Sequence, residues 1–209
     1  MESIAPLLMF AAIAAFTPGP NNIMIMSSGL NHGIRASLPH FLGICLGFPS
    51  MILAVGLGLG YVFNRYPILH IALQVVGVVY LLYLSWLIAS SEPNRLEQNN
   101  TPPLTFIQAA LFQWINPKAW IMGTSALAAY TTVGDRSIVQ TLIVVAVFLL
   151  MAFPSAGVWL IFGNGLKKLL SQPFHQRCFN VAMGLLLVLS IMPIILELGS
   201  ALMMANLGS

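Results

Sequence analysis

Charged side chains are scarce in this sequence, and that scarcity decides the class of protein. Charged residues make up 6% of the 209 positions, whereas hydrophobic residues make up 58%. A soluble domain carries roughly 25% charged residues, and a domain of this size leaves about a third of its chain surface in water. A soluble fold cannot cover so much apolar surface, so lipid must cover the remainder. The sequence therefore predicts an all-α integral membrane protein.

Other scarcities exclude several kinds of partner. The formal net charge is only +3, spread over loops, and gives no reason to expect a nucleic acid partner. The only two cysteines, Cys45 and Cys178, share no CxxC or Cys/His spacing. We therefore expect no metal site and no cofactor, and we interpret both cysteines as small core residues.

Six apolar stretches reach the length of about 20 residues that a membrane helix needs. They lie at roughly 4–29, 37–63, 67–90, 105–131, 137–164 and 178–198. A polar linker at 92–104 separates the first three from the last three. We therefore expect one transmembrane transporter domain over residues 1–209, with repeat one at about 1–91 and repeat two at about 105–209.

Lysine and arginine counts in the loops give the orientation. The loops after the first, third and fifth predicted helices hold five such residues, whereas the loops after the second and fourth hold two. Positively charged loops stay in the cytoplasm, which places the linker inside and both termini outside.

An odd number of helices in each half means that the second half starts from the opposite side of the membrane. That is the arrangement of an inverted repeat of three helices. Phe48-Pro49-Ser50 and Phe153-Pro154-Ser155 lie at matching positions of the second and fifth predicted helices. Gly33-Ile34-Arg35 and Gly134-Asp135-Arg136 precede those same helices. The agreement in position supports two inverted repeats.

The first and fourth predicted helices are broken near their middles. The breaks are Thr17-Pro18-Gly19-Pro20-Asn21-Asn22 and Asn116-Pro117-Lys118. Proline removes a backbone donor and clashes with the preceding turn, and broken backbone at membrane depth is tolerated only where protein or a water-filled cavity covers it. Pro20 and Pro117 suit the first position of a new half-helix, and Asn116 suits the cap. Two half-helix N-termini near the midplane would attract a carboxylate, although packing kinks without a ligand are the alternative.

Lys118 is the strongest single indication of a site. A lysine near the bilayer centre is costly and usually functional. No aspartate or glutamate lies at similar depth in another predicted helix, so its partner is either a substrate anion or backbone carbonyls freed by the breaks. His40, one turn into the second predicted helix, is the candidate for proton coupling because histidine titrates near neutral pH; a structural role stays open for it.

Two other classes of protein explain the sequence less well. An intramembrane enzyme has weak support, since Gly123-Thr124-Ser125-Ala126 only loosely matches a serine protease motif and a serine nucleophile needs a nearby base. A structural or assembly protein of the membrane would explain the helices but not Lys118 or the paired breaks. We therefore expect a transporter, not an enzyme.

The motifs resemble those of the LysE/RhtB amino-acid exporters. Phe16-Thr17-Pro18-Gly19-Pro20-Asn21-Asn22, His32-Gly33-Ile34-Arg35 and Asn116-Pro117-Lys118-Ala119-Trp120 carry the resemblance, which covers the whole chain and is nearest to the cysteine/O-acetylserine exporter branch. The resemblance implies ion-driven efflux of amino acids or their derivatives across a bacterial inner membrane. The outward direction rests on the resemblance alone.

These observations together predict a substrate site and a substrate class. The expected binding residues are Pro18, Gly19, Pro20, Asn21, Asn22, Asn116, Pro117 and Lys118. Half-helix N-termini and Lys118 suit one carboxylate, and the lack of deep acids disfavours a cationic side chain. We expect a small neutral amino acid of the cysteine, O-acetylserine, homoserine or threonine type. Proton antiport is the expected coupling, and a chain this short encloses only a modest cavity unless it forms a homodimer.

Overall fold

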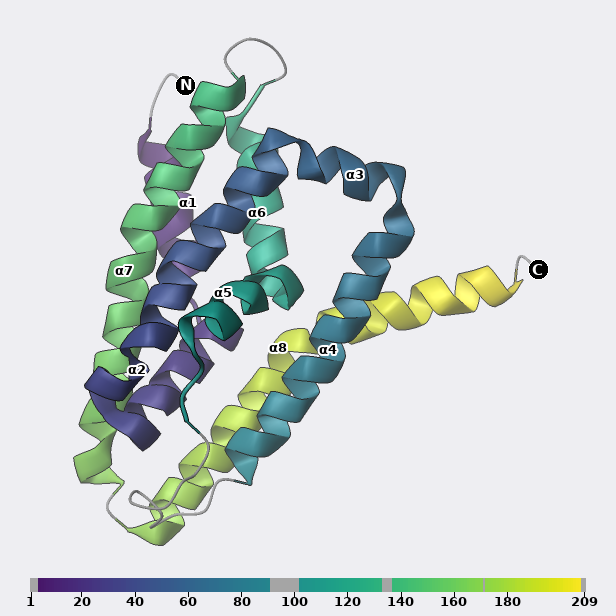
Figure 1. The fold of residues 1–209 in the computed structure, drawn as a ribbon. Coiled ribbons are helices and arrows are strands. Elements are labelled where there is room, and N and C mark those ends of the chain that lie inside the picture. Colours follow the sequence, from purple (N-terminus) through teal and green to yellow (C-terminus); the bar gives the residue numbers. More distant parts are fainter. Residues whose placement is uncertain (1–3, 91–101, 133–136, 171, 208–209) are drawn as a thin grey trace.

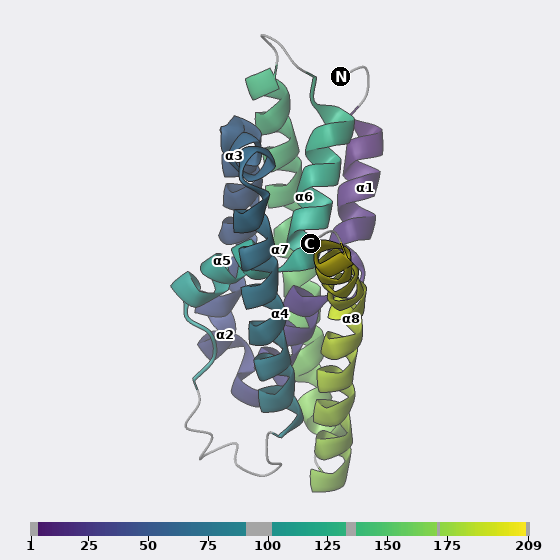
Figure 2. The same ribbon diagram turned by 90° about the vertical axis from the view of Figure 1, so that its right-hand side faces the viewer.

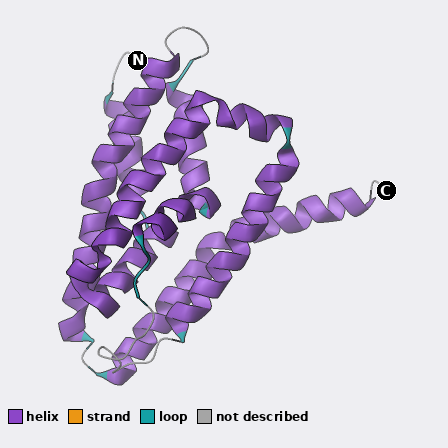
Figure 3. Ribbon diagram, viewed as in Figure 1, coloured by secondary structure: helices purple, strands orange, loops and turns teal. Residues whose placement is uncertain are grey.

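The structure is helical throughout the part of the chain that it describes. It is a computed structural model that describes residues 4–90, 102–132, 137–170 and 172–207. Figure 3 shows only helices and connecting loops in those ranges, which confirms the all-α prediction. The elements are α1 (Ala5–Phe16), α2 (Pro20–Ala54), the π-helical turn η1 (Val55–Leu59), α3 (Gly60–Arg65), α4 (Pro67–Ala89), α5 (Phe106–Ile115), α6 (Pro117–Tyr130), α7 (Ser137–Leu169) and α8 (Pro173–Leu207).

The helices form a bundle and an attached pair. Helices α1, α2, α6 and α7 run side by side in the bundle, and α4 and α8 pack along each other next to it (Figure 1). Helix α3 links η1 at the end of α2 to the start of α4, and the second view shows α5 at mid-height on the same side of the molecule as α2 (Figure 2). The short α5 contacts α2, so it closes one side of the bundle.

Helix α2 is a helical hairpin rather than one straight rod. Gly33, within it, has a φ of 80°, a left-handed conformation that favours glycine. The hydroxyl oxygens of Ser28 and Ser37 lie 2.7 Å apart, whereas nine residues of straight helix would separate them by about 13.5 Å. The chain therefore reverses at Gly33 into two arms, 20–32 and 34–54.

The hairpin corrects the predicted boundary between the first two membrane helices. Residues 30–36 were expected to be a loop, but helix continues up to Gly33 and resumes directly after it. One glycine is enough to reverse the chain, because Ser37 Oγ donates to the Gly33 carbonyl at 2.8 Å and satisfies it. The repeat marker 134–136 and most of the 92–104 linker lie outside the described residues.

Four helical stretches of the described chain are long and apolar enough to cross a bilayer. They are Pro20–Val62, Ile71–Ala89, Ser137–Leu166 and Pro173–Met192. Helix α1 has 12 residues and α5 has 10. A 12-residue helix is only about 18 Å long, against about 30 Å of hydrocarbon. Helices α1 and α5 therefore cannot cross a bilayer alone.

The two halves of the chain interlock instead of forming separate cores. Helix α1 of the first half packs on α7, and α5 of the second half packs on α2. The largest core cluster accordingly mixes both halves, with buried Leu7, Phe48, Trp120 and Phe148. The Phe48 and Phe148 rings meet edge to face at a centroid distance of 5.3 Å, a favoured aromatic geometry.

Candidate functional site

Both predicted helix breaks are present, and the second is capped as its sequence indicates. Helix α1 ends at Phe16 and α2 begins at Pro20, while α5 ends at Ile115 and α6 begins at Pro117. Proline stands at the start of each new helix, where its missing N–H costs nothing. Asn116 caps α6, because its side-chain oxygen accepts the backbone N–H of Lys118 at 3.2 Å. The first break leaves three residues outside a helix, whereas the second leaves one.

Lys118 joins the two breaks directly. Its ammonium donates to the Thr17 carbonyl at 2.6 Å, to the Thr17 hydroxyl at 2.9 Å and to the Pro18 carbonyl at 3.3 Å. The C-terminal end of a helix carries a partial negative charge, which stabilises a cation placed there. Of the two partners that the sequence allowed, backbone carbonyls are the ones that Lys118 contacts in this structure.

Gly19 makes room for the lysine. A Cβ atom at this position would lie 2.6 Å from Lys118 Cδ and 3.0 Å from Nζ. The backbone of Gly19 is fully extended, with φ of −179° and ψ of 178°, so glycine is not needed here for backbone conformation. It is needed because the lysine side chain lies against the bare backbone.

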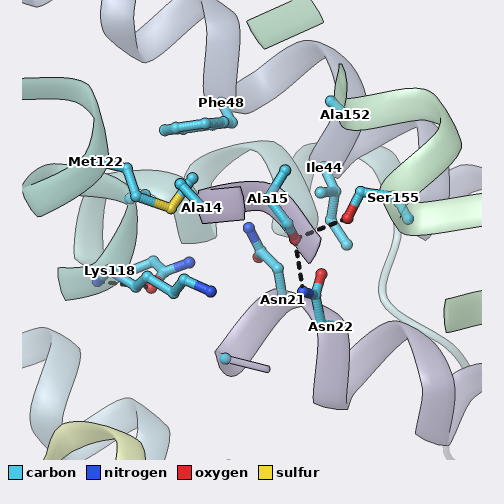
Figure 4. Close-up of a pocket in the computed structure, with 14 residues that line it drawn as sticks. Ala14, Ala15, Asn21, Asn22, Ile44, Phe48, Lys118, Met122, Ala152 and Ser155 are labelled. Atoms are coloured by element: carbon cyan, nitrogen blue, oxygen red, sulfur yellow. Dashed lines mark hydrogen bonds between the residues drawn. The ribbon is translucent and has the colours of Figure 1, made fainter. Parts of the chain in front are cut away.

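Two carbonyls at the end of α1 also accept hydrogen bonds from other helices. The Asn22 amide donates to the carbonyls of Ala15 at 2.9 Å and Thr17 at 2.8 Å. Ser155 of α7 donates to the same Ala15 carbonyl at 2.8 Å. Figure 4 shows Asn22 and Ser155 converging on Ala15. The end of α1 is thus held by side chains from α2, α6 and α7.

A reciprocal pair of amides links the beginning of α2 to the end of α5. Asn21 donates to the Gln113 side-chain oxygen at 2.8 Å, and Gln113 donates back to Asn21 at 3.1 Å. Gln113 is fully buried and also donates to the Ala109 carbonyl at 2.9 Å. Asn21 and Asn22 were expected among the substrate-binding residues, and in this structure both side chains bond to other groups of the protein.

These groups surround a small cavity between the breaks. Its volume is about 50 Å³, space for a few water molecules at about 10–15 Å³ each. Among the predicted site residues, Gly19, Asn21, Asn22, Asn116 and Lys118 line it. The opposite walls are apolar and include Ala14, Ile44, Phe48, Met122, Ala152 and Ala156 (Figure 4). Pro18, Pro20 and Pro117 do not line the cavity and act on the backbone around it.

The cavity has one cation and no acidic side chain. None of its lining residues is an aspartate or glutamate, and the sequence has no acid anywhere in 3–91, 98–134 or 136–196. Lys118 is countered by the partial charges of carbonyls alone. The arrangement suits a ligand that brings its own carboxylate to Lys118 and its own ammonium to carbonyl oxygens.

His40 lies away from this cavity. It sits on the second arm of α2 with 2% of its surface exposed, and it lines a separate cavity. The sequence places His40 only one turn into a predicted helix, where we would expect it to lie near the membrane surface. It is deeply buried instead, because the hairpin folds one arm of α2 over the other.

Sequence reasoning missed Gln113 and Ser155 as contributors to this region. Ser155 was noted only as part of a repeated tripeptide. A signal for Gln113 existed, since a glutamine three residues before the Asn116 break interrupts an apolar run. A buried amide in such a place needs a partner, although the sequence does not say which one.

The comparisons with known proteins agree with one another. The family model described as LysE type translocator matches residues 12–204. A protein named cysteine/O-acetylserine efflux protein from Escherichia coli O1:K1 is 31% identical over 181 residues, covering 86% of this chain and 90% of the relative. Proteins of the same name from Escherichia coli K12 and Shigella flexneri serotype 5b are 30% identical with the same coverage. No solved structure matches the chain.

Proposed function

The chain belongs to the LysE-type translocators, and from that premise we propose that it exports a small neutral amino acid or a close derivative. Members of this family are transporters and not enzymes, and the apolar helices fit a protein that crosses the membrane several times. Its curated relatives are named for efflux of cysteine and O-acetylserine. Compounds of that size and charge are therefore the first substrates to test.

The contact between Lys118 and the end of α1 carries the proposal. In this structure the Lys118 ammonium donates to the Thr17 and Pro18 carbonyls. A zwitterion can exchange both partners at once: its carboxylate binds Lys118 and the free N–H groups at the start of α2, while its ammonium takes the carbonyls that the lysine leaves. A substrate with a second positive charge would find no acid in this cavity, so neutral amino acids are favoured.

The size of the cavity supports a small substrate and a moving site. A volume of about 50 Å³ holds waters but not a whole amino acid. The cavity must therefore widen when substrate binds, and the two helix breaks are natural hinges because they lack continuous backbone hydrogen bonds. Compact substrates need the least widening.

The architecture that we propose is six membrane crossings in two inverted repeats of one domain, with the linker in the cytoplasm of a bacterial inner membrane. The 12 residues of α1 plus the 13 of the first α2 arm (20–32) give about 38 Å of helix. The 10 residues of α5 plus the 14 of α6 give about 36 Å. Each sum is enough for one broken crossing, and the mutual packing of α1 on α7 and α5 on α2 fits two related halves.

Proton antiport is the proposed coupling. The titratable groups available for it are Lys118, His40 and the ammonium of the substrate, because no carboxylate lies deep within the spans. The substrate ammonium and Lys118 compete for the same Thr17 and Pro18 carbonyls, so substrate binding changes the surroundings that set the protonation of Lys118.

Efflux from proteoliposomes tests the proposal. Vesicles loaded with radiolabelled O-acetylserine, cysteine, threonine or lysine are diluted with and without a pH gradient. We expect efflux of the neutral compounds, acceleration by the gradient and little lysine efflux.

Lys118→Ala should abolish efflux of the neutral compounds. Lys118→Arg should also lack this efflux, because a planar guanidinium does not replace a compact ammonium. Arg177→Ala removes an exposed cation of α8 and is the matched control. Preferred efflux of lysine would contradict the assigned substrate class, and normal efflux by Lys118→Ala would contradict the site.

A further inference from the structure

A second cavity lies at the far end of the first α2 arm from the central one. Its volume is about 120 Å³, against about 50 Å³ for the central cavity. The first arm begins beside the central cavity at Asn22 and reaches the second cavity through Ser27 and Asn31. These side chains lie about 8 Å and about 14 Å further along the helix axis. The first arm of α2 therefore contributes side chains to the walls of both cavities.

The walls of the second cavity differ in polarity. Ser27, Ser28, Asn31, His32 and His40 form a polar side contributed by both arms of α2. Leu84, Leu87 and Ile88 of α4 form an apolar side, and residues 102–104 close it toward the linker. Among the described residues that line it, none is a lysine, arginine, aspartate or glutamate. Such a surface suits a small polar molecule without net charge that has an apolar edge.

His40 indicates that this cavity takes a hydrogen-bonding guest. The side chain is only 2% exposed, and its buried Nδ1 atom has no hydrogen-bond partner among the residues that the structure describes. Buried polar atoms nearly always have a partner. The neighbouring hydroxyls do not serve it, because Ser28 pairs with Ser37 and Ser27 accepts from Asn31 at 3.2 Å.

We propose that this cavity is a second station for the substrate, on the linker side of the protein, where an amino acid binds through its polar side chain before it reaches Lys118. The inference rests on the proposed export function for the identity of the ligand. The linker side is the cytoplasmic side in the proposed orientation, so an exported amino acid meets this station first. The hydroxyl, thiol or ester of the substrate bonds to His40, and its methylene groups lie against the leucines of α4.

Substrate protection of engineered cysteines tests the station directly. Cys45→Ala and Cys178→Ser remove the native thiols, and Ser27→Cys, Asn31→Cys or Arg35→Cys is added singly. A small methanethiosulfonate reagent labels each thiol, with and without saturating O-acetylserine, which has no thiol of its own. We expect labelling of Ser27→Cys and Asn31→Cys to slow at least fivefold. Arg35 is exposed beyond the hairpin turn, so Arg35→Cys should label at the same rate in both conditions.

Each cysteine variant is then combined with Lys118→Ala. This distinguishes substrate bound in the second cavity from a conformational change that substrate causes by binding at Lys118. Protection at Ser27→Cys that persists without Lys118 supports an independent station. Protection that disappears with Lys118, or no protection in protein that still exports, overturns it. Protection without any efflux from proteoliposomes would instead contradict the export function and leave the station standing.

Transport kinetics give a second measurement with a conservative rescue. His40→Leu removes one hydrogen bond to the substrate, for which we expect a rise in KM of about 2- to 12-fold. His40→Gln keeps a hydrogen-bonding group and should recover most of that loss. Equal KM values for wild type and His40→Leu at unchanged thermal stability would overturn the role of His40.

Discussion

Gly19→Ala is the sharpest perturbation of the central site, because it moves one ammonium without changing a charge. The new Cβ would lie 2.6 Å from Lys118 Cδ. Ordinary carbon contacts are about 3.5–4.0 Å, so the lysine must shift by about 1 Å. The backbone need not change, since Gly19 is extended, and a lysine tip moves easily. We therefore expect a folded protein with nearly unchanged thermal stability.

The functional effect follows from the hydrogen bonds that the shift breaks. A displacement of about 1 Å lengthens the 2.6 Å contact between Lys118 Nζ and the Thr17 carbonyl beyond the usual limit of about 3.2 Å. In the proposed bound state the same shift moves the ammonium away from the substrate carboxylate. A hydrogen bond between charged groups contributes about 1.5–3 kcal/mol, which corresponds to about 10- to 140-fold in affinity. We expect substrate binding and the efflux rate to weaken within that range.

The assay compares initial efflux rates, equilibrium binding of O-acetylserine and thermal unfolding in detergent. Gly165→Ala is the control, because a Cβ there meets no atom within 4 Å. The double variant with Lys118→Ala is decisive, since Gly19→Ala should cost nothing further once the lysine chain is gone. Wild-type binding by Gly19→Ala, or additive losses in the double variant, would refute the reasoning.

Three further expectations concern stability and orientation. Gln113→Leu removes a reciprocal amide pair and leaves the half-buried Asn21 amide unsatisfied, which should lower the free energy of unfolding by about 1–3 kcal/mol in a thermal or denaturant assay; unchanged stability would contradict the pair. Gly163→Ala places a Cβ against the Met26 carbonyl and should separate α2 from α7, with a clear loss of thermal stability that Gly165→Ala does not show. Reporter fusions should be active as cytoplasmic markers at Gln98 and as external markers at Gly208, and the reverse pattern would overturn the orientation.

The helix breaks could be predicted because their causes are local. Proline and glycine disrupt a helix wherever they occur inside it, and Asn116 before Pro117 is a cap followed by a first helical residue. The depth of Lys118 followed from the length of the surrounding apolar run. These features depend on neighbours in the sequence, and the structure has both breaks where the sequence placed them.

The partners within the site could not be predicted because they come from distant segments. The bond from Ser155 to Ala15 spans 140 residues, and the pair of Asn21 with Gln113 spans 92. The hairpin at Gly33 was missed because a positive φ at one glycine replaces the loop that the polar residues suggested. The deep burial of His40 follows from that hairpin, so the wrong prediction at Gly33 also led to a wrong prediction for the surroundings of His40.

The interlocking of the two halves has a consequence for how the protein is made. Helix α2 finds its main partner in α7, which ends at residue 169, whereas α2 ends at residue 54. A ribosome adding about 5–20 residues per second needs about 6 to 23 seconds for the 115 residues between those ends. Throughout that interval the newly inserted first half has lipid, or a helper protein of the insertion machinery, where its permanent neighbour will be. Its serine and asparagine side chains also wait for partners, so slow translation or early release would expose this chain to quality-control proteases before it can fold.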